Sequence, residues 1–240
     1  MAIDQSRVKA VIFDYGNTLI EFVARHADHC LNALAAGLES EFGPVDRALL
    51  KTRCDAHRMK PYQGDYREND VAAFTQQLVR ELYDCDATPT QIYHLMHARR
   101  KAFVDVIEAP DFVHGFLHRM QSCYPLAMIS NFPCGQSLRE SLARTGIDQF
   151  MQAVVVSGDL GFVKPHPVVF ETILDQLNIQ PDQAVYIGDN WLGDIQGSKK
   201  LGMQAVFICQ YNTLEVFEPK PGDLQPDLTI HHLLELEDHL

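Results

Sequence analysis

The fold of this chain is decided by one stretch near its start, residues 8–19, which reads VKAVIFDYGNTL. Its apolar part, Val11–Phe13, is short, β-branched and aromatic, which predicts a buried strand. Gly16 and Asn17 are turn formers, so Asp14 is expected at the carboxyl end of that strand. Ligands of open parallel α/β sheets bind beyond this edge. Asp14 is therefore a candidate functional carboxylate, and the alternative is that it only caps the following helix.

Short apolar runs of the same kind recur after residue 110 and alternate with segments of helical periodicity. The expected strands cover residues 126–129, 153–156, 184–187, 205–208 and 228–230. The expected helices cover residues 111–120, 136–145, 167–177 and 195–201, with a last turn over 233–238. Strands that alternate with helices predict an α/β fold with a doubly wound parallel sheet.

A second region, residues 21–107, shows helical patterns and no strand pattern. Helices are expected over 25–42 and 46–59, a third after Asn69 or Asp70, and a fourth opened by Thr88-Pro89. This shift predicts an α/β core of residues 1–20 and 108–240 with an inserted α-helical cap domain of residues 21–107. Such a cap would overhang the carboxyl edge of the sheet and exclude water from a reaction there. The alternative is a structural domain without a gating role.

The overall composition excludes several classes of protein. The 240 residues are 46% hydrophobic and 22% charged, enough for one large domain or a core with a smaller one. A net charge of −12 without a Lys/Arg-rich run argues against nucleic acid and anionic membranes as partners. An anionic substrate would need positive charge concentrated locally, from a bound cation or a few placed Lys and Arg side chains.

The six cysteines are scattered without a CxxC pair, which argues against a disulfide framework or a structural zinc site. Free thiols fit a reducing, cytoplasmic location. Residues 1–7 are polar and carry no apolar signal segment, and no stretch is long enough to span a bilayer. The oligomeric state is left open between monomer and homodimer.

Polar side chains gather at the predicted strand ends and in one loop. They are Asp14, Ser130, Asn131, Lys164, Asp189 and Asp194. Carboxylates that converge at one sheet edge repel each other, and a hard cation such as Mg²⁺ resolves this repulsion together with waters and a phosphate oxygen. Ser130 and the backbone N–H groups that follow Asp14 and Ser130 can donate hydrogen bonds to a phosphoryl group. Lys164 supplies positive charge to the nucleophile and the transferring group.

Each of these features also has an ordinary structural explanation. A Ser-Asn pair after a strand is more often a simple turn, and Lys-Pro is common in loops. The segment from Gly188 to Asp194 is more specific, because it places two acids at a strand end and across the next turn. The four features are Asp14, Ser130-Asn131, Lys164-Pro165 and the segment from Gly188 to Asp194. Their order and spacing in one chain make coincidence improbable.

These four features resemble the four motifs of the haloacid dehalogenase superfamily, most of whose members are magnesium-dependent phosphatases. Asp14-x-x-x-Thr18-Leu19 resembles the first, Ser130 the second, Lys164-Pro165 the third, and Gly188-Asp189-x-x-x-x-Asp194 the fourth. The resemblance covers the whole chain, including the helical cap, and implies a Rossmann-like core.

The resemblance also implies a role for each matching residue. Asp14 would be the nucleophile that becomes an aspartyl phosphate, assisted by Ser130 and Lys164. Mg²⁺ would be held by Asp14, Asp189, Asp194 and the Gly16 carbonyl. The residues expected to bind the phosphate are Asn131, Gly16, Asn17 and Thr18. The expected substrate is a small phosphorylated metabolite.

Gly16 departs from the pattern of these phosphatases, which usually carry a second Asp at this position. That Asp protonates the leaving group and then activates water, and general acid–base catalysis contributes about 10²–10⁴-fold. A cap residue could replace it, and the candidates are His26, His29, Lys60 and Tyr66. Otherwise the leaving group needs no protonation, or the protein is a weak or inactive phosphate-binding regulatory protein.

Two other reactions fit the missing acid. The superfamily's 2-haloacid dehalogenases also lack it, but they work without Mg²⁺ and do not need the carboxylates at Asp189 and Asp194, which argue against this reaction. Phosphonatases, which cleave C–P bonds, have a small residue at the Gly16 position and use a cap lysine. Lys51 and Lys60 lie in the cap region, although no sequence context marks either as activated.

The substrate itself is not encoded in a readable motif. Specificity is expected in the cap and its loop of residues 60–67, where Tyr62, Tyr66 and Arg67 could contact a polar or anionic leaving group or be ordinary loop residues. Trp191 could line the cleft or pack beneath the fourth motif.

Overall fold

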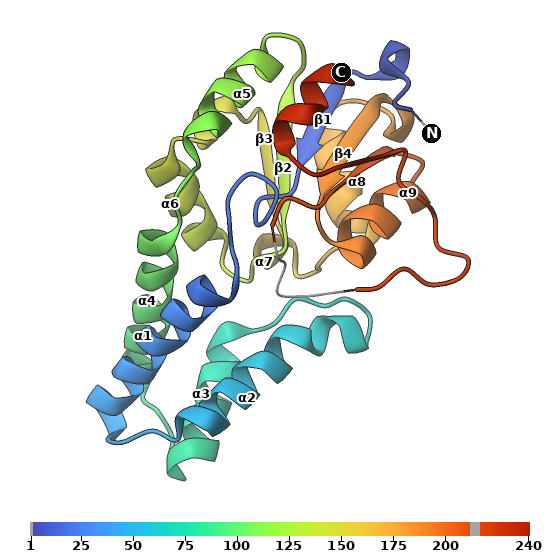
Figure 1. Ribbon diagram of the computed structural model, residues 1–240. Coiled ribbons are helices and arrows are strands. Elements are labelled where there is room, and N and C mark those ends of the chain that lie inside the picture. Colours follow the sequence, from blue (N-terminus) through green and yellow to red (C-terminus); the bar gives the residue numbers. More distant parts are fainter. Residues whose placement is uncertain (1, 212–216) are drawn as a thin grey trace.

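The computed structural model describes residues 2–211 and 217–240 (Figure 1). In these residues six parallel strands form one sheet in the order β3-β2-β1-β4-β5-β6. The strands are β1 (Ala10–Phe13), β2 (Leu126–Ser130), β3 (Ala153–Val156), β4 (Ala184–Gly188), β5 (Gln204–Ile208) and β6 (Leu228–Ile230). The predicted parallel sheet is confirmed, because every pair of neighbouring strands in it is parallel. Parallel neighbours require the crossover connections that the helices between the strands supply.

Strand β1 lies inside the sheet between β2 and β4, and all four of its residues are buried. Phe13 is in register with Met128 of β2 and with Ile187 of β4. The three strands therefore end within two residues of one another, and the residues that follow them meet at the carboxyl edge of the sheet.

Helices cover both faces of the sheet, as a doubly wound fold requires. Because side chains alternate along a strand, Val11 and Phe13 pack on one face and Ile12 on the other. The first face is covered by α5 (Asp111–Gln121), α6 (Gly135–Thr145) and the C-terminal 3₁₀ turn η6 (Leu233–Asp238). The second face is covered by α8 (Pro167–Leu177).

The chain between β1 and β2 forms a helical insertion, which we define as residues 24–106. It contains α1 (Ala24–Phe42), α2 (Arg47–Met59), a 3₁₀ turn η2 (Lys60–Gln63), α3 (Val71–Tyr83) and α4 (Pro89–Val106). Asp46, Asp70 and Thr88 cap α2, α3 and α4 through their side chains. Leucines from all four helices bury one another in a cluster separate from the sheet's own core, and the insertion fills the lower part of Figure 1.

Two of the contacts between the helical insertion and the rest of the chain position the loops near the sheet edge. At the first, Tyr66 accepts a hydrogen bond from the Val163 N–H at 2.9 Å, and the Glu68 N–H donates to Gly161 at 2.9 Å. The Glu68 carboxylate also accepts a hydrogen bond from Ser157. At the second, α4 packs beside α6. Loop 66–68 is thereby held against the loop that leads to Lys164.

Two elements differ from the expectation. The predicted helix over 195–201 begins earlier, with a π-helical turn η5 (Trp191–Gln196) that leads into α9 (Gly197–Lys200). A short helix α7 (Ser157–Leu160) follows β3, where no element was predicted. Among the described helices, none combines the length with the apolar composition that crossing a bilayer requires.

Candidate active site

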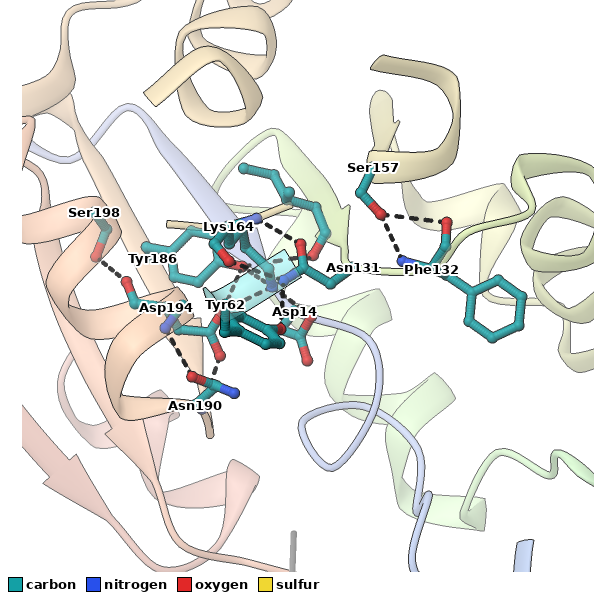
Figure 2. A network of polar contacts seen from close by, with 12 residues as sticks. Asp14, Tyr62, Asn131, Phe132, Ser157, Lys164, Tyr186, Asn190, Asp194 and Ser198 are labelled. Carbon is teal, nitrogen blue, oxygen red and sulfur yellow. Dashed lines mark hydrogen bonds and ion pairs between the residues drawn. The ribbon is translucent and has the colours of Figure 1, made fainter. Parts of the chain in front are cut away.

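The side chain of Lys164 lies at the centre of a buried polar cluster (Figure 2). Its Nζ donates hydrogen bonds to Asp14 Oδ1 and Asp194 Oδ1, both at 2.6 Å, and lies 3.2 Å from the Ile129 carbonyl. The Tyr186 hydroxyl is 2.8 Å from the same nitrogen. The ammonium group is thereby surrounded by oxygen atoms, which an ammonium buried this deeply requires.

The carboxylates come from two adjacent strands. Asp14 follows β1, and Asp189 follows β4 directly. Asp194 lies one turn later on η5, where its Oδ2 accepts a hydrogen bond from the Asn190 N–H at 2.9 Å. The π-helical turn therefore brings Asp194 close to the end of β4. The helix predicted over 195–201 assumed regular α-helical spacing, which does not describe this turn.

Asn131 fixes the position of Lys164. Its Oδ1 accepts a hydrogen bond from the Lys164 N–H at 2.7 Å, and its Nδ2 donates to the Lys164 carbonyl at 3.1 Å. The same Nδ2 donates to the Tyr62 hydroxyl of the helical insertion at 3.2 Å (Figure 2). Both ends of this amide are engaged, so Asn131 positions Lys164 rather than offering its side chain to a ligand.

The three carboxylates are arranged so that they can hold a cation. One oxygen from each of Asp14, Asp189 and Asp194 lies within 4.8 Å of the others. Among the described residues no other side chain bonds to the Asp189 carboxylate, whereas both Asp194 oxygens already accept hydrogen bonds. An all-oxygen site of this size fits Mg²⁺, with Asp14 and Asp189 as the most available ligands.

Burial and mutual repulsion set the charges of the cluster. Burial raises the pKa of Asp14 to about 6, against the lowering effect of Lys164. Burial and then the charges of Asp14 and Asp194 raise the pKa of Asp189 well above its usual range. For Lys164, burial acts to lower the pKa, but Asp14 and Asp194 outweigh it and the pKa is raised. Without a cation, Asp14 and Asp189 therefore tend to keep their protons, because their full ionisation would exceed the charge that Lys164 balances, and a divalent cation would favour the ionised forms.

A cavity of about 610 Å³ opens in front of these carboxylates. Ser130, Asn131, Gly16 and Asn17, which the sequence analysis assigned to catalysis or phosphate binding, line this cavity. The sequence-predicted phosphate contact at Thr18 does not fit, because its side chain is completely buried outside the cavity lining. The tight turn after Asp14 folds Thr18 into the protein, where its hydroxyl has no described hydrogen-bond partner.

None of the four proton-donor candidates proposed from the sequence lines this cavity. His26 instead accepts a hydrogen bond from the Val23 N–H at 3.0 Å and caps α1. His29 and Lys60 are exposed, and the backbone of Tyr66 is engaged with Val163. None of these four side chains is therefore placed to replace the carboxylate that is missing at Gly16.

The remaining cap candidates divide between the cavity and the surface. Tyr62 and Lys51 line the cavity, and Lys51 is paired with Asp55 at 3.0 Å. Arg67 does not line it and lies over the ring of Phe162, 5.2 Å from its centroid.

Trp191 packs below the fourth motif rather than lining the cavity. Its ring meets Phe207 edge to face, and its Nε1 donates to Asp223 at 2.8 Å.

Tyr186 is a member of the cluster that the sequence reasoning missed. It lies in the middle of β4, fully buried, and its hydroxyl contacts both Lys164 and Asp194. A signal did exist, since a tyrosine in a strand otherwise made of aliphatic residues needs a buried partner for its hydroxyl.

We expect Lys164→Met to lower the free energy of unfolding by about 3–5 kcal/mol, because it leaves buried carboxylates without their ammonium partner. Carboxyl groups whose pKa is raised in the folded state destabilise it as they ionise, so the loss should be larger at pH 8 than at pH 5. Urea unfolding at both pH values measures this. Lys101→Met, which breaks an exposed pair with Asp105, is the control and should stay close to wild type.

Comparisons with known proteins agree on the family. A family model described as haloacid dehalogenase-like hydrolase matches residues 47–208. A curated protein named glyceraldehyde 3-phosphate phosphatase, from Methanopyrus kandleri, is 27% identical over 96% of this chain and 96% of its own length.

Two solved structures have the same fold. A 2-haloacid dehalogenase from Pseudomonas syringae superposes with a TM-score of 0.73 at 19% identity, covering 96% of this chain and 97% of its own. A hydrolase from Bacillus subtilis, bound to magnesium, superposes with a TM-score of 0.69 at 20% identity, covering 97% and 98%.

Proposed function

The chain belongs to the haloacid dehalogenase-like hydrolases, and we propose that it hydrolyses phosphate monoesters of small metabolites through an aspartyl phosphate on Asp14. The observation that carries this proposal is the contact between Asp14 and Lys164 at the end of β1, next to Asp189. A curated relative named for phosphatase activity, similar over nearly its whole length, supports the same substrate class.

In the proposed first step, the carboxylate oxygen of Asp14 attacks phosphorus and the bond from phosphorus to the leaving oxygen breaks. The hydrogen bond from Lys164 to Oδ1 orients the carboxylate, and Asp14 lines the cavity. Ser130 lines the cavity, and its hydroxyl forms no hydrogen bond with another described group. It can therefore donate to a phosphoryl oxygen as negative charge develops there.

Magnesium is the cofactor that we propose. Asp14 and Asp189 would hold it with the Gly16 carbonyl, and Asp194 would complete the site directly or through water. When bound, Mg²⁺ would neutralise the carboxylates and polarise the phosphoryl group. Asp194 has a further role, because it shares Lys164 with Asp14 and so keeps the ammonium beside the nucleophile.

In the proposed second step, water attacks the phosphorus of the aspartyl phosphate and releases inorganic phosphate and free Asp14. Both steps move a proton, and glycine at position 16 has no side chain to carry it. We therefore propose that the enzyme is slow on alkyl phosphates and faster on esters or acyl phosphates whose leaving groups depart without protonation.

We further propose that the helical insertion, with the residues around it from 21 to 107, acts as a cap. Supporting this, the Tyr62 hydroxyl accepts a hydrogen bond from Asn131, and the Glu68 carboxylate accepts one from Ser157, and both Tyr62 and Glu68 line the cavity. A cap closed by these contacts over a bound substrate would exclude water while the first step proceeds.

Dehalogenation is the second candidate, because it shares the missing acid and one dehalogenase has a similar fold. The convergence of Asp189 and Asp194 on Asp14 favours the phosphatase. Assaying chloride release from 2-chloropropionate beside phosphate release separates the two reactions. Phosphonoacetaldehyde tests C–P cleavage, and binding of phosphate without turnover of any compound would indicate a regulatory protein.

We expect that removing divalent metal with EDTA abolishes phosphate release from 4-nitrophenyl phosphate and that excess MgCl₂ restores it. The reason is that the three carboxylates would repel an incoming phosphate without the cation. Calcium chloride is the control for MgCl₂. It should restore less activity, because the larger ion prefers longer distances and more ligands than Mg²⁺. Phosphate release that persists through chelation would contradict the proposed metal dependence.

A further inference from the structure

The cavity is much larger than its acidic end needs. Its volume of about 610 Å³ lies within the range of sites that enclose a drug-sized ligand. A phosphoryl group at Asp14 would occupy only one end. The cavity continues between α1, α2 and α4 of the helical insertion, where Leu31, Cys54 and Met96 line it. A substrate that fills it must carry an extended leaving group.

The middle of the cavity is apolar and aromatic. Phe103 of α4 lies 4.2 Å from Phe132, centroid to centroid, and 5.8 Å from Phe22. All three rings line the cavity. This section favours a hydrocarbon or aromatic portion of the ligand, because burial of apolar surface is its main source of affinity.

Beyond these rings the helical insertion contributes cationic side chains, and most of them are already paired. Lys51 and Arg58 both contact the Asp55 carboxylate, at 3.0 and 3.3 Å. Arg100 forms an ion pair with Glu140 of α6. Among residues 2–211 and 217–240, by contrast, Arg99 has no hydrogen bond or ion pair.

Arg99 lies on the inner face of α4, between Leu95 and Phe103, which are one turn away on either side and buried. Its charge acts on residues of two other helices. It opposes the burial that raises the pKa of Cys30 on α1, and it adds to the burial that lowers the pKa of His57 on α2 to about 4. The guanidinium thus faces the space enclosed by three helices.

His57 provides a second unsatisfied group in this space. Its ring lines the cavity and stacks on Phe74 with centroids 3.7 Å apart, and its Nε2 is buried without a hydrogen-bond partner in the described residues. With its pKa near 4, the ring is neutral at physiological pH. The Arg99 guanidinium, which stays charged at all physiological pH values, and the neutral His57 ring are therefore both available to bind a ligand.

We propose that Arg99 is a specificity-determining residue that binds a carboxylate at the far end of an extended, largely apolar leaving group, with His57 beside it. This inference rests on the proposed phosphatase function, since it places the phosphate of the same substrate at Asp14. A planar guanidinium matches a carboxylate through two parallel hydrogen bonds. The aromatic section between the two ends excludes a polar chain.

The test compares ω-carboxyalkyl phosphonates with n-alkyl phosphonates of the same chain lengths, by calorimetric titration in MgCl₂. These compounds keep the phosphorus group and are not hydrolysed as esters. For wild type we expect the carboxylate to tighten binding by about 10- to 100-fold at one favoured chain length. Arg99→Gln should lose this preference, and Arg99→Lys should keep part of it.

Arg53→Gln is the matched control, because Arg53 is another arginine of the helical insertion but pairs with Glu81 and does not line the cavity. It should keep the wild-type preference. No preference for the carboxylate in wild type, or equal weakening of both series by Arg99→Gln, would overturn the proposal. Phosphate release from 4-nitrophenyl phosphate, whose leaving group departs without a proton, is assayed in parallel. Preserved carboxylate-dependent binding without any turnover would show that the proposed reaction fails while the recognition by Arg99 stands.

Discussion

Asp14→Asn is expected to reduce phosphate release by on the order of 10³- to 10⁶-fold, since loss of a nucleophile removes the covalent route altogether. The amide is nearly isosteric with the carboxylate, and its oxygen can still accept the hydrogen bond from Lys164. The variant should therefore fold. It should still bind phosphonates, although it turns over esters very slowly. Steady-state assays with 4-nitrophenyl phosphate measure turnover, urea unfolding measures stability, and calorimetric titration measures phosphonate binding.

The control for this variant is Asp175→Asn, the same chemical change on the exposed face of α8. It should leave kcat/KM unchanged. If Asp14→Asn retained activity within a few-fold of Asp175→Asn, Asp14 would not be the nucleophile. Detection of an acid-stable, hydroxylamine-sensitive phosphoprotein in wild type, absent in Asp14→Asn, would add direct support for the aspartyl phosphate.

The sheet could be predicted from the sequence because its determinants are local. Each strand is a short buried apolar run, and the acids follow the runs directly, so β1 and β4 fix Asp14 and Asp189 with no further information. Parallel strands in register then bring their ends together. The helices of the insertion were predicted for the same reason, since Asp46, Asp70 and Thr88 mark their starts.

The parts that were not predicted depend on tertiary contacts. The π-helical turn at Trp191–Gln196 allows Asp194 to bond both Lys164 and the Asn190 N–H, and no periodicity in the sequence records that requirement. Helix α7 is only four residues long and contains a glycine whose N–H donates to Phe132, a residue of another loop. Local propensity is weak over such a length.

Arg99 illustrates a third case, in which the pattern was visible but its meaning was not. The residue follows the apolar spacing of α4, four positions after Leu95 and four before Phe103. Periodicity places it on the inner face, but it does not distinguish an arginine that reaches solvent from one that faces a cavity. Only the positions of α1 and α2 show that Arg99 lines a cavity between the helices.

Gly16→Asp is expected to raise the turnover of alkyl phosphates by about 10²- to 10⁴-fold, the usual contribution of general acid–base catalysis. The position accepts a side chain, because an added Cβ would lie 3.7 Å from Phe22 Cβ, an ordinary contact. At Gly188, by contrast, a Cβ would lie 2.3 Å from Asp194. The new carboxyl group would be two residues after Asp14, at the rim of the cavity, where it can protonate the leaving oxygen and then activate water.

The most informative measurement on Gly16→Asp compares substrates with different leaving groups. The gain should be large for an n-alkyl phosphate and small for 4-nitrophenyl phosphate, whose leaving group departs without a proton. Gly16→Asn adds the same bulk and no titratable group, so it should show no gain. Assays at saturating MgCl₂ separate proton transfer from any effect of the added charge on metal affinity. Equal rates for Gly16→Asp and Gly16→Asn on the alkyl ester would mean that proton transfer does not limit this enzyme, and that its natural leaving group departs unprotonated.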